Sequence, residues 1–111
     1  MELSSFTVSL NPQNHVQLQW VTQSETDVMG FQIFRATVSN WEEAISVSDM
    51  ISATNTSQMQ SYLWVDKEKL APIRYYYWLE SVDYDGYSDF FGPVNIFLED
   101  NIGVIPAIPP D

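Results

Sequence analysis

The chain has 111 residues, the size of one domain, and a domain of this length buries about two-thirds of the surface of its unfolded chain. It has no cysteine and one histidine, which excludes disulfides, thiolate chemistry, the common catalytic triads and histidine-based zinc sites. Fifteen acidic residues against four basic ones give a net charge of −11, which excludes a nucleic-acid partner, and no apolar run approaches the roughly 18 residues of a membrane span.

Two strands are predicted at the start of the chain, over residues 3–10 and 16–21. In both, apolar side chains alternate with polar ones at a period of two, so each strand is expected to bury one face. Residues 11–14 between them contain a Pro and two Asn, which favour a turn because Pro fixes φ and Asn tolerates unusual φ values. The two strands therefore form an antiparallel hairpin, with Leu18 and Trp20 on its buried face.

A third strand is predicted over residues 31–36. The polar segment 22–29 comes before it, and Gly30 separates the two. The alternation of the strand places Ile33 on the core face and Phe34 on the opposite face.

The segment 37–60 allows two interpretations. In the first, residues 41–45 form a short helical turn capped by Ser39 or Asn40, because acidic residues suit the N-terminus of a helix. In the second, the apolar residues of 45–51 belong to an irregular strand. Both interpretations remain open at this point.

The last third of the chain gives three strand predictions, over residues 61–65, 74–83 and 87–98. The Asp-Gly pair at 85–86 is a hairpin turn between the last two strands. Pro93 is expected to interrupt the final strand, or to lie where its missing N–H would face solvent.

Residues 99–111 are predicted to be a linker stub. They hold three of the six prolines and no aromatic residue. The folded domain is therefore expected to span residues 1–98. About seven short strands separated by turns indicate an all-β antiparallel sandwich.

Two segments carry a resemblance to a known family. They are LQWVTQSETDVMGFQIFR at residues 18–35 and YYWLESVDYDG at residues 76–86. In this order they resemble fibronectin type III-like domains of the kind found in secreted multidomain bacterial proteins, over residues 3–98. The resemblance implies an immunoglobulin-like antiparallel β-sandwich of about seven strands with Greek-key connections, and it implies no chemistry.

The family resemblance also bears on which tyrosine points inward. A Leu-x-Pro-x-x-x-Tyr pattern marks that tyrosine in the family, and by this spacing Leu70 and Pro72 select Tyr76. Alignment of the strand itself selects Tyr75 instead. We favour Tyr75, because it directs Tyr77 and Leu79 into the core and leaves Glu80 outside. A shift of one residue would exchange the two faces of the strand.

This register predicts both faces of the sandwich. The structural core is expected to consist of Trp20, Leu18, Ile33, Tyr75, Tyr77 and Leu79. The outward aromatic face would consist of Phe34, Tyr76 and Trp78, with Trp41 nearby. Such a face suits sugar rings or a partner domain. We favour the other interpretation, in which the segment 37–53, which carries Trp41, Ile45 and Ile51, folds across this face and covers it.

The acidic clusters are expected to be structural or solvated. Residues 83–89 resemble part of a calcium loop, but Gly92 stands where that loop needs a bidentate Glu, so a hairpin turn is predicted instead. The acidic pair at 42–43 and the pair Asp66 and Glu68 lie in predicted loops that build no cleft, and we interpret both as solvated surface. No catalytic residue, metal ligand or cofactor is predicted.

These features predict a non-catalytic accessory module of a larger secreted or cell-surface bacterial protein. It would serve as a spacer, a support or a protein–protein contact, with neighbouring domains of the same polypeptide or another protein as partners. The alternative is a carbohydrate-binding module that uses the aromatic face. The bacterial origin and the extracellular location follow from the resemblance alone.

Overall fold

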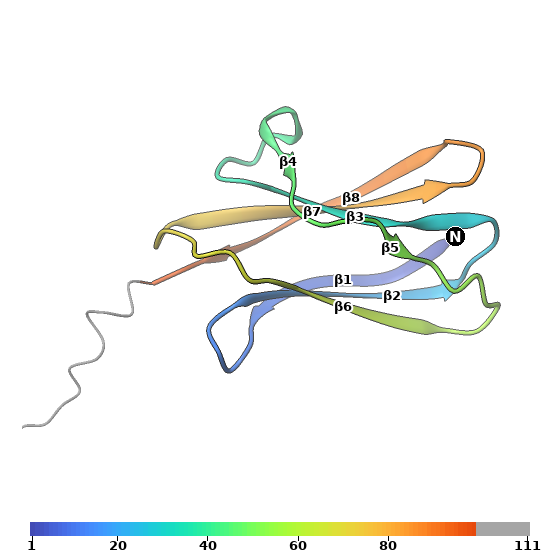
Figure 1. The fold of residues 1–111 in the computed structure, drawn as a ribbon, viewed down its shortest axis with the longest axis horizontal. Coiled ribbons are helices and arrows are strands. Elements are labelled where there is room, and N and C mark those ends of the chain that lie inside the picture. Colours follow the sequence, from blue (N-terminus) through green and yellow to red (C-terminus); the bar gives the residue numbers. More distant parts are fainter. Residues whose placement is uncertain (100–111) are drawn as a thin grey trace, which may run out of the picture.

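The computed structural model describes residues 1–99, so the predicted linker lies outside the described residues except for Glu99. The strands are β1 (Glu2–Leu10), β2 (Val16–Ser24), β3 (Val28–Ala36), β4 (Ile45–Ser46), β5 (Ile51–Ser52), β6 (Gln60–Asp66), β7 (Arg74–Asp83) and β8 (Ser88–Phe97). One sheet has the order β1-β2-β6, and the other has the order β4-β3-β7-β8, with β5 also paired to β3. Every pairing is antiparallel, and Figure 1 shows the two sheets as stacked layers. The predicted all-β sandwich is confirmed.

Both sheets contribute one face to a shared core. Along β2, Leu18 and Trp20 point inward and are fully buried, and their register partners in β1 and β6 continue the same face. The residues predicted for the core are all buried: Leu18, Trp20, Ile33, Tyr75, Tyr77 and Leu79. Removal of these apolar side chains from water is the main force that holds the layers together.

Gly30 lies inside a strand, which corrects the prediction that it separates a polar segment from the third strand. β3 already begins at Val28, and Gly30 pairs with Ser52 of β5. A Cβ atom at Gly30 would lie 2.5 Å from the carbonyl oxygen of Ile51. The glycine is therefore needed because β5 approaches the backbone of β3 closely.

The final strand has an irregularity at Gly92. The register of β8 against β7 shifts between Tyr77 and Leu79, and Gly92 has a φ of 115°, a value that favours glycine. A Cβ atom at Gly92 would lie 2.8 Å from the carbonyl oxygen of Tyr77. Pro93 follows this bulge and is exposed on an edge strand, in line with the expectation that it disturbs the strand.

Both interpretations of the segment 37–60 hold in part. A 3₁₀ turn, η1 (Trp41–Glu43), follows Asn40, whose side chain accepts a hydrogen bond from the Glu42 amide at 3.1 Å. The short strands β4 and β5 come after it and take the place of one longer predicted strand.

No helix within residues 1–99 is long and apolar enough to cross a membrane.

Tyr75 is the inward tyrosine, so the spacing that selects Tyr76 is misleading here. The Tyr75 hydroxyl donates a hydrogen bond to the carbonyl oxygen of Ala71 at 3.0 Å, and the ring is buried. Tyr76 lies on the opposite face, where its register partner is Asn95. The hydroxyl of Tyr75 thereby ties the start of β7 to the connection before it, as in a tyrosine corner.

Candidate functional site

The outer face of the second sheet gathers aromatic side chains. Along β7 the inward positions alternate with outward ones, so Tyr76, Trp78 and Glu80 belong to the outer face. On β3 the register partner of Trp78 is Phe34. On β8 the register partner of Glu80 is Phe90.

Trp41 packs onto this face from η1 and draws the rings into one cluster. Its ring centroid lies 4.8 Å from that of Phe34, 4.2 Å from that of Phe90 and 5.8 Å from that of Trp78. We call Phe34, Trp41, Trp78 and Phe90 the aromatic patch. Trp78 is only 5% exposed beneath Trp41, whereas Phe90 is 47% exposed. The patch is thus partly covered and partly open to solvent.

The sequence predicts some residues of the aromatic patch but not all of them. Phe34, Trp41 and Trp78 come together as predicted for one face, and Tyr76 is half-buried on the same face. The expected cover from the segment 37–53 comes from Trp41. Ile51 instead packs against the core, and Ile45 is exposed, so these two residues do not cover the face.

Phe90 is a patch residue that the sequence reasoning missed. Counting by twos from the inward residues Ile96 and Val94 assigns Phe90 to the core. The bulge at Gly92 reverses the count, so that Phe91 pairs with the inward residue Leu79 and Phe90 points outward. The pair Gly92 and Pro93 within this predicted strand was the sequence signal that the alternation of inward and outward side chains is interrupted there.

The rings of the patch do not form a flat platform. The planes of Phe34, Phe90 and Trp78 are inclined to that of Trp41 by 63°, 54° and 72°. Tilted and edge-to-face contacts of this kind are favourable between aromatic rings, so they stabilise the patch.

Glu25 forms a second cluster, which no local pattern in the sequence indicates. The carboxylate is buried and accepts hydrogen bonds from the Thr22 hydroxyl at 2.7 Å, the Tyr62 hydroxyl at 2.6 Å, and the backbone amides of Thr54 and Asn55 at 3.0 and 2.8 Å. Burial alone would raise the pKa of Glu25, but these hydrogen bonds outweigh it, so the pKa lies below its usual value of 4.5. The cluster fixes the loops after β2 and β5 to strand β6.

The hydrogen bonds to Glu25 should make the stability of the domain depend on pH. Because the pKa is lowered by folding, the carboxylate stabilises the folded state fully above about pH 4.5 and less as the pH falls through the folded value. Glu25→Gln should therefore cost about 1–3 kcal/mol at pH 7, since some donors lose their acceptor. The difference from the parent should shrink below pH 4.5. Urea denaturation of both proteins from neutral to acidic pH measures it.

Glu43→Gln is the matched control for this prediction, because Glu43 is exposed. Its free energy of unfolding should stay within about 0.5 kcal/mol of the parent at each pH. An equal and pH-independent loss in both variants would contradict a stabilising role of the Glu25 carboxylate.

Asp66 is buried, which corrects its interpretation as solvated surface. Its carboxylate is only 2% exposed, and Oδ2 accepts hydrogen bonds from Arg35 Nη1 at 2.6 Å and from the Tyr77 hydroxyl at 2.8 Å. Arg35 Nη2 also donates to Glu68, which is exposed, at 2.7 Å. Burial alone would lower the pKa of Arg35, but the hydrogen bonds to Asp66 and Glu68 outweigh it, so the pKa lies above its usual value. The pKa of Tyr77 is also raised, by burial and by the hydrogen bond to Asp66. These groups join β3 and β7 of one sheet to β6 of the other.

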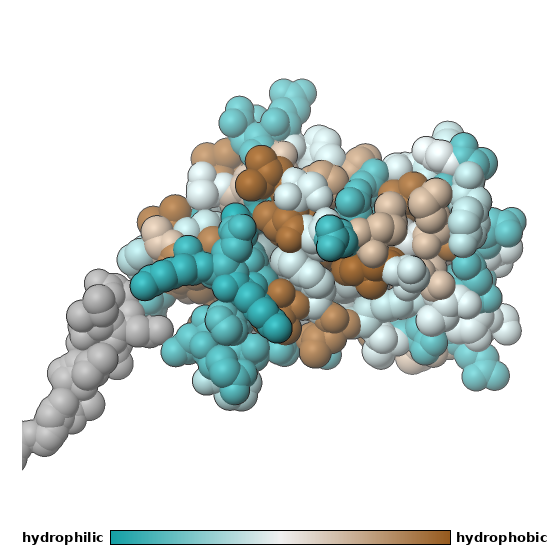
Figure 2. Space-filling model, viewed as in Figure 1, coloured by the Kyte–Doolittle hydropathy of each residue, from teal (hydrophilic) through white to brown (hydrophobic). Residues whose placement is uncertain are grey.

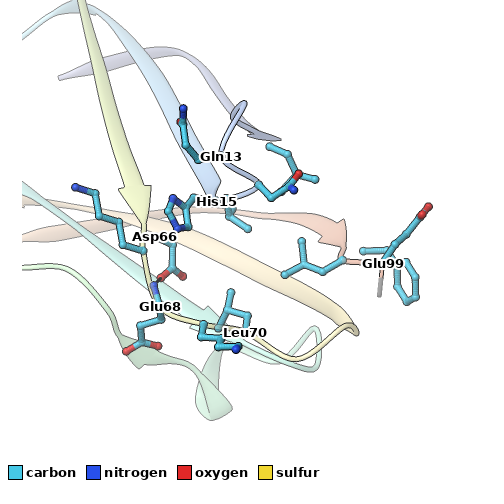
Figure 3. Close-up of a pocket in the computed structure, with 13 residues that line it drawn as sticks. Gln13, His15, Asp66, Glu68, Leu70 and Glu99 are labelled. Carbon is cyan, nitrogen blue, oxygen red and sulfur yellow. Dashed lines mark hydrogen bonds between the residues drawn. The ribbon is translucent and has the colours of Figure 1, made fainter. Parts of the chain in front are cut away.

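A cavity of about 620 Å³ lies between the β1–β2 turn, the segment after β6 and the end of β8. Figure 3 shows the side chains of His15, Asp66 and Glu68 along one wall and Glu99 on the opposite side. Asp66 and Glu68 are already engaged by Arg35. The cavity therefore offers no carboxylate pair free for acid–base chemistry at that wall.

The segment between β7 and β8 forms the predicted hairpin turn and not a calcium loop. The Asp83 amide donates to the Tyr87 carbonyl at 2.8 Å, and Gly86 takes a φ of 92°. Within residues 1–99 no group of three or more His, Cys, Asp or Glu side chains lies close enough to hold a metal ion.

The side of the molecule that carries β4, β5 and β6 offers no further candidate. Figure 2 shows hydrophobic residues interleaved there with hydrophilic ones, with no continuous apolar surface. We take the aromatic patch as the candidate contact surface, because its rings are clustered and Phe90 is half-exposed.

The fold is that of a fibronectin type III-like β-sandwich. The chain resembles an Fn3-like protein from Clostridium thermocellum with a TM-score of 0.65 and 15% sequence identity, over 90% of this chain and 94% of that one. No family model and no curated protein matches the sequence.

Two pectate lyases share the same fold over part of their length. The structure of PelI from Erwinia chrysanthemi, solved with tetragalacturonic acid, matches with a TM-score of 0.67 and 17% identity over 86% of this chain. The structure of Pel3 from Pectobacterium carotovorum matches with a TM-score of 0.64 and 16% identity over 94% of this chain. This chain spans 28% of the length of each lyase chain. At these identities the likeness shows the fold alone.

Proposed function

We propose that this domain is a non-catalytic accessory module that supports or contacts other domains. The observation that carries the proposal is its overlap with known structures: it matches nearly all of an Fn3-like protein but only 28% of the pectate lyase chains. A sandwich of this kind thus makes up nearly all of one crystallised chain and a minor part of the pectate lyase chains.

The polar interior supports the same proposal. Glu25 and Asp66, which are buried, each accept hydrogen bonds from several neighbours and thereby join strands and loops. A general base needs an acceptor site that is free to reach a substrate proton. These carboxylates have the surroundings of structural groups.

The aromatic patch is the contact surface in this proposal. Its rings lie on the outer face of a sheet, and Phe90 is half-exposed. The inclined rings favour a protein contact over the alternative of a carbohydrate-binding module, because stacking on sugars is best served by exposed ring faces lying in one plane.

The extracellular location is also a proposal. A net charge of −11 keeps a domain soluble and self-repelling, which suits a secreted or cell-surface bacterial protein. Fractionation of the source cells, with an antibody raised against this domain, tests it: recovery in the cytoplasmic fraction alone would overturn it.

Assays for turnover test the non-catalytic role. The purified chain should release no product from tetragalacturonic acid, from other glycosides, or from ester and peptide substrates, because no nucleophile, base and orienting group come together in the described residues. Turnover of any of these substrates that is abolished by a single carboxylate substitution would overturn the proposal.

A further inference from the structure

We propose that the aromatic patch binds a basic segment of a partner protein, in which arginine or lysine side chains meet the exposed rings and the carboxylates beside them. This inference rests on the proposed role of the patch as a contact surface. It adds the chemical class of the partner.

Three acidic residues adjoin residues of the patch, one on the same strand and two along the chain. Glu80 follows Trp78 by two residues on the same face of β7, and its register partner on β8 is Phe90. Glu42 and Glu43 directly follow Trp41 in η1, and both are exposed. We call Glu42, Glu43 and Glu80 the acidic rim.

No basic residue within residues 1–99 forms an ion pair with the acidic rim. Arg35 makes the ion pairs found within residues 1–99, and these go to Asp66 and Glu68. Lys67 and Lys69 line the cavity at the end of β6, and Lys69 also lines a second cavity of about 390 Å³ together with Glu43 and Arg35, without an ion pair to Glu43. The remaining cation, Arg74, is at the start of β7, where it donates to Asn95 and stacks over Phe97.

An aromatic surface bordered by unpaired carboxylates is complementary to a cation. Guanidinium and ammonium groups are attracted to aromatic rings, and the aliphatic stems of Arg and Lys pack against apolar surface. The net charge of −11 adds a long-range field that attracts a basic partner and accelerates its association. The same charge repels a second copy of this chain, so the patch is suited to a different partner.

Binding of a short synthetic peptide of alternating Arg and Ser tests the proposal. It should shift the backbone amide NMR signals of the patch and the rim, namely those near Phe34, Trp41, Trp78 and Phe90, more than signals elsewhere. A peptide of alternating Glu and Ser should give no such shifts. Larger shifts around the cavity than around the patch, or saturable binding of a neutral oligosaccharide at the patch in place of the Arg peptide, would overturn the proposal.

Two variants of equal net charge separate specific binding from general attraction. The triple variant Glu42→Gln, Glu43→Gln, Glu80→Gln should weaken binding of the Arg peptide about tenfold, since each lost pair is worth a fraction of a tenfold step. The control variant Glu2→Gln, Asp27→Asn, Asp85→Asn changes the charge by the same amount away from the patch. It should weaken binding by less than about threefold at physiological salt, where distant charges are screened. Equal losses in both variants would overturn the proposal.

The variant Phe90→Thr distinguishes this inference from the proposed function. Phe90 is exposed on an edge strand, and Thr suits a strand, so the fold should be kept. Loss of peptide binding in both Phe90→Thr and the rim variant supports the inference. Loss in Phe90→Thr with full binding by the rim variant would overturn the basic partner and leave the contact role of the patch intact. Full binding by both variants would remove the patch as a contact surface.

Discussion

Replacement of Trp20 by alanine should lower the free energy of unfolding by about 3–5 kcal/mol, a large part of the ~5–15 kcal/mol that stabilises a typical domain. Trp20 is fully buried at the centre of β2. Its ring is stacked on Tyr62 with centroids 5.4 Å apart and forms a T-shaped pair with Phe31 with centroids 5.6 Å apart. The substitution would leave a large cavity between both sheets. Urea denaturation of the variant and the parent measures the loss.

Leu63→Ala is the control for Trp20→Ala. Leu63 lies on the neighbouring strand β6, but it faces outward and is 57% exposed. Its truncation should change the free energy of unfolding by no more than about 0.5 kcal/mol. A loss below about 1 kcal/mol for Trp20→Ala would contradict the central place of this residue in the core.

Asp66→Leu should also cost about 3–5 kcal/mol, because it removes the acceptor shared by the buried Tyr77 hydroxyl and the partly buried Arg35 guanidinium. The side chain of Arg35, which is only 11% exposed, would keep Glu68 as its remaining partner. The Tyr77 hydroxyl would remain buried without an acceptor. Thermal and urea denaturation measure the cost.

The reason for this cost can be tested by removing the donors as well. Adding Arg35→Met and Tyr77→Phe to Asp66→Leu should restore about 2 kcal/mol or more, because both side-chain donors are then removed and only the partly buried Glu68 amide loses its acceptor. Glu68→Gln, at the exposed end of the same network, should cost less than about 1 kcal/mol. If the triple variant is less stable than Asp66→Leu alone, the loss comes from packing and not from unpaired polar groups.

Much of the fold follows from local patterns in the sequence. The alternation of Val16, Leu18 and Trp20 places β2 and its buried face correctly, because a strand with one buried face repeats every two residues. The limits of β7 match the prediction, and the inward direction of Tyr75 follows from keeping Glu80 out of the core. Burial on one face is a constraint that acts residue by residue, so the sequence displays it.

The polar clusters could not be predicted in the same way. The hydrogen-bond partners of Glu25 on Thr54 and Tyr62 lie 29 and 37 residues further along the chain, and Arg35 and Asp66 are 31 residues apart. Nothing in the neighbouring residues distinguishes these carboxylates from solvated ones. Their burial depends on how distant loops meet after the sheets have stacked.

The bulge at Gly92 has a consequence for insertions and deletions in related sequences. Gly92 and Pro93 together stand opposite the single residue Trp78, so β8 holds one residue more than regular pairing needs while both of its halves keep their faces. Removal of Gly92 would restore regular pairing, with Phe91 still opposite Leu79 and Phe90 still opposite Glu80. A sandwich of this kind can therefore gain or lose one residue at this point without exchanging the buried and the surface face of its last strand.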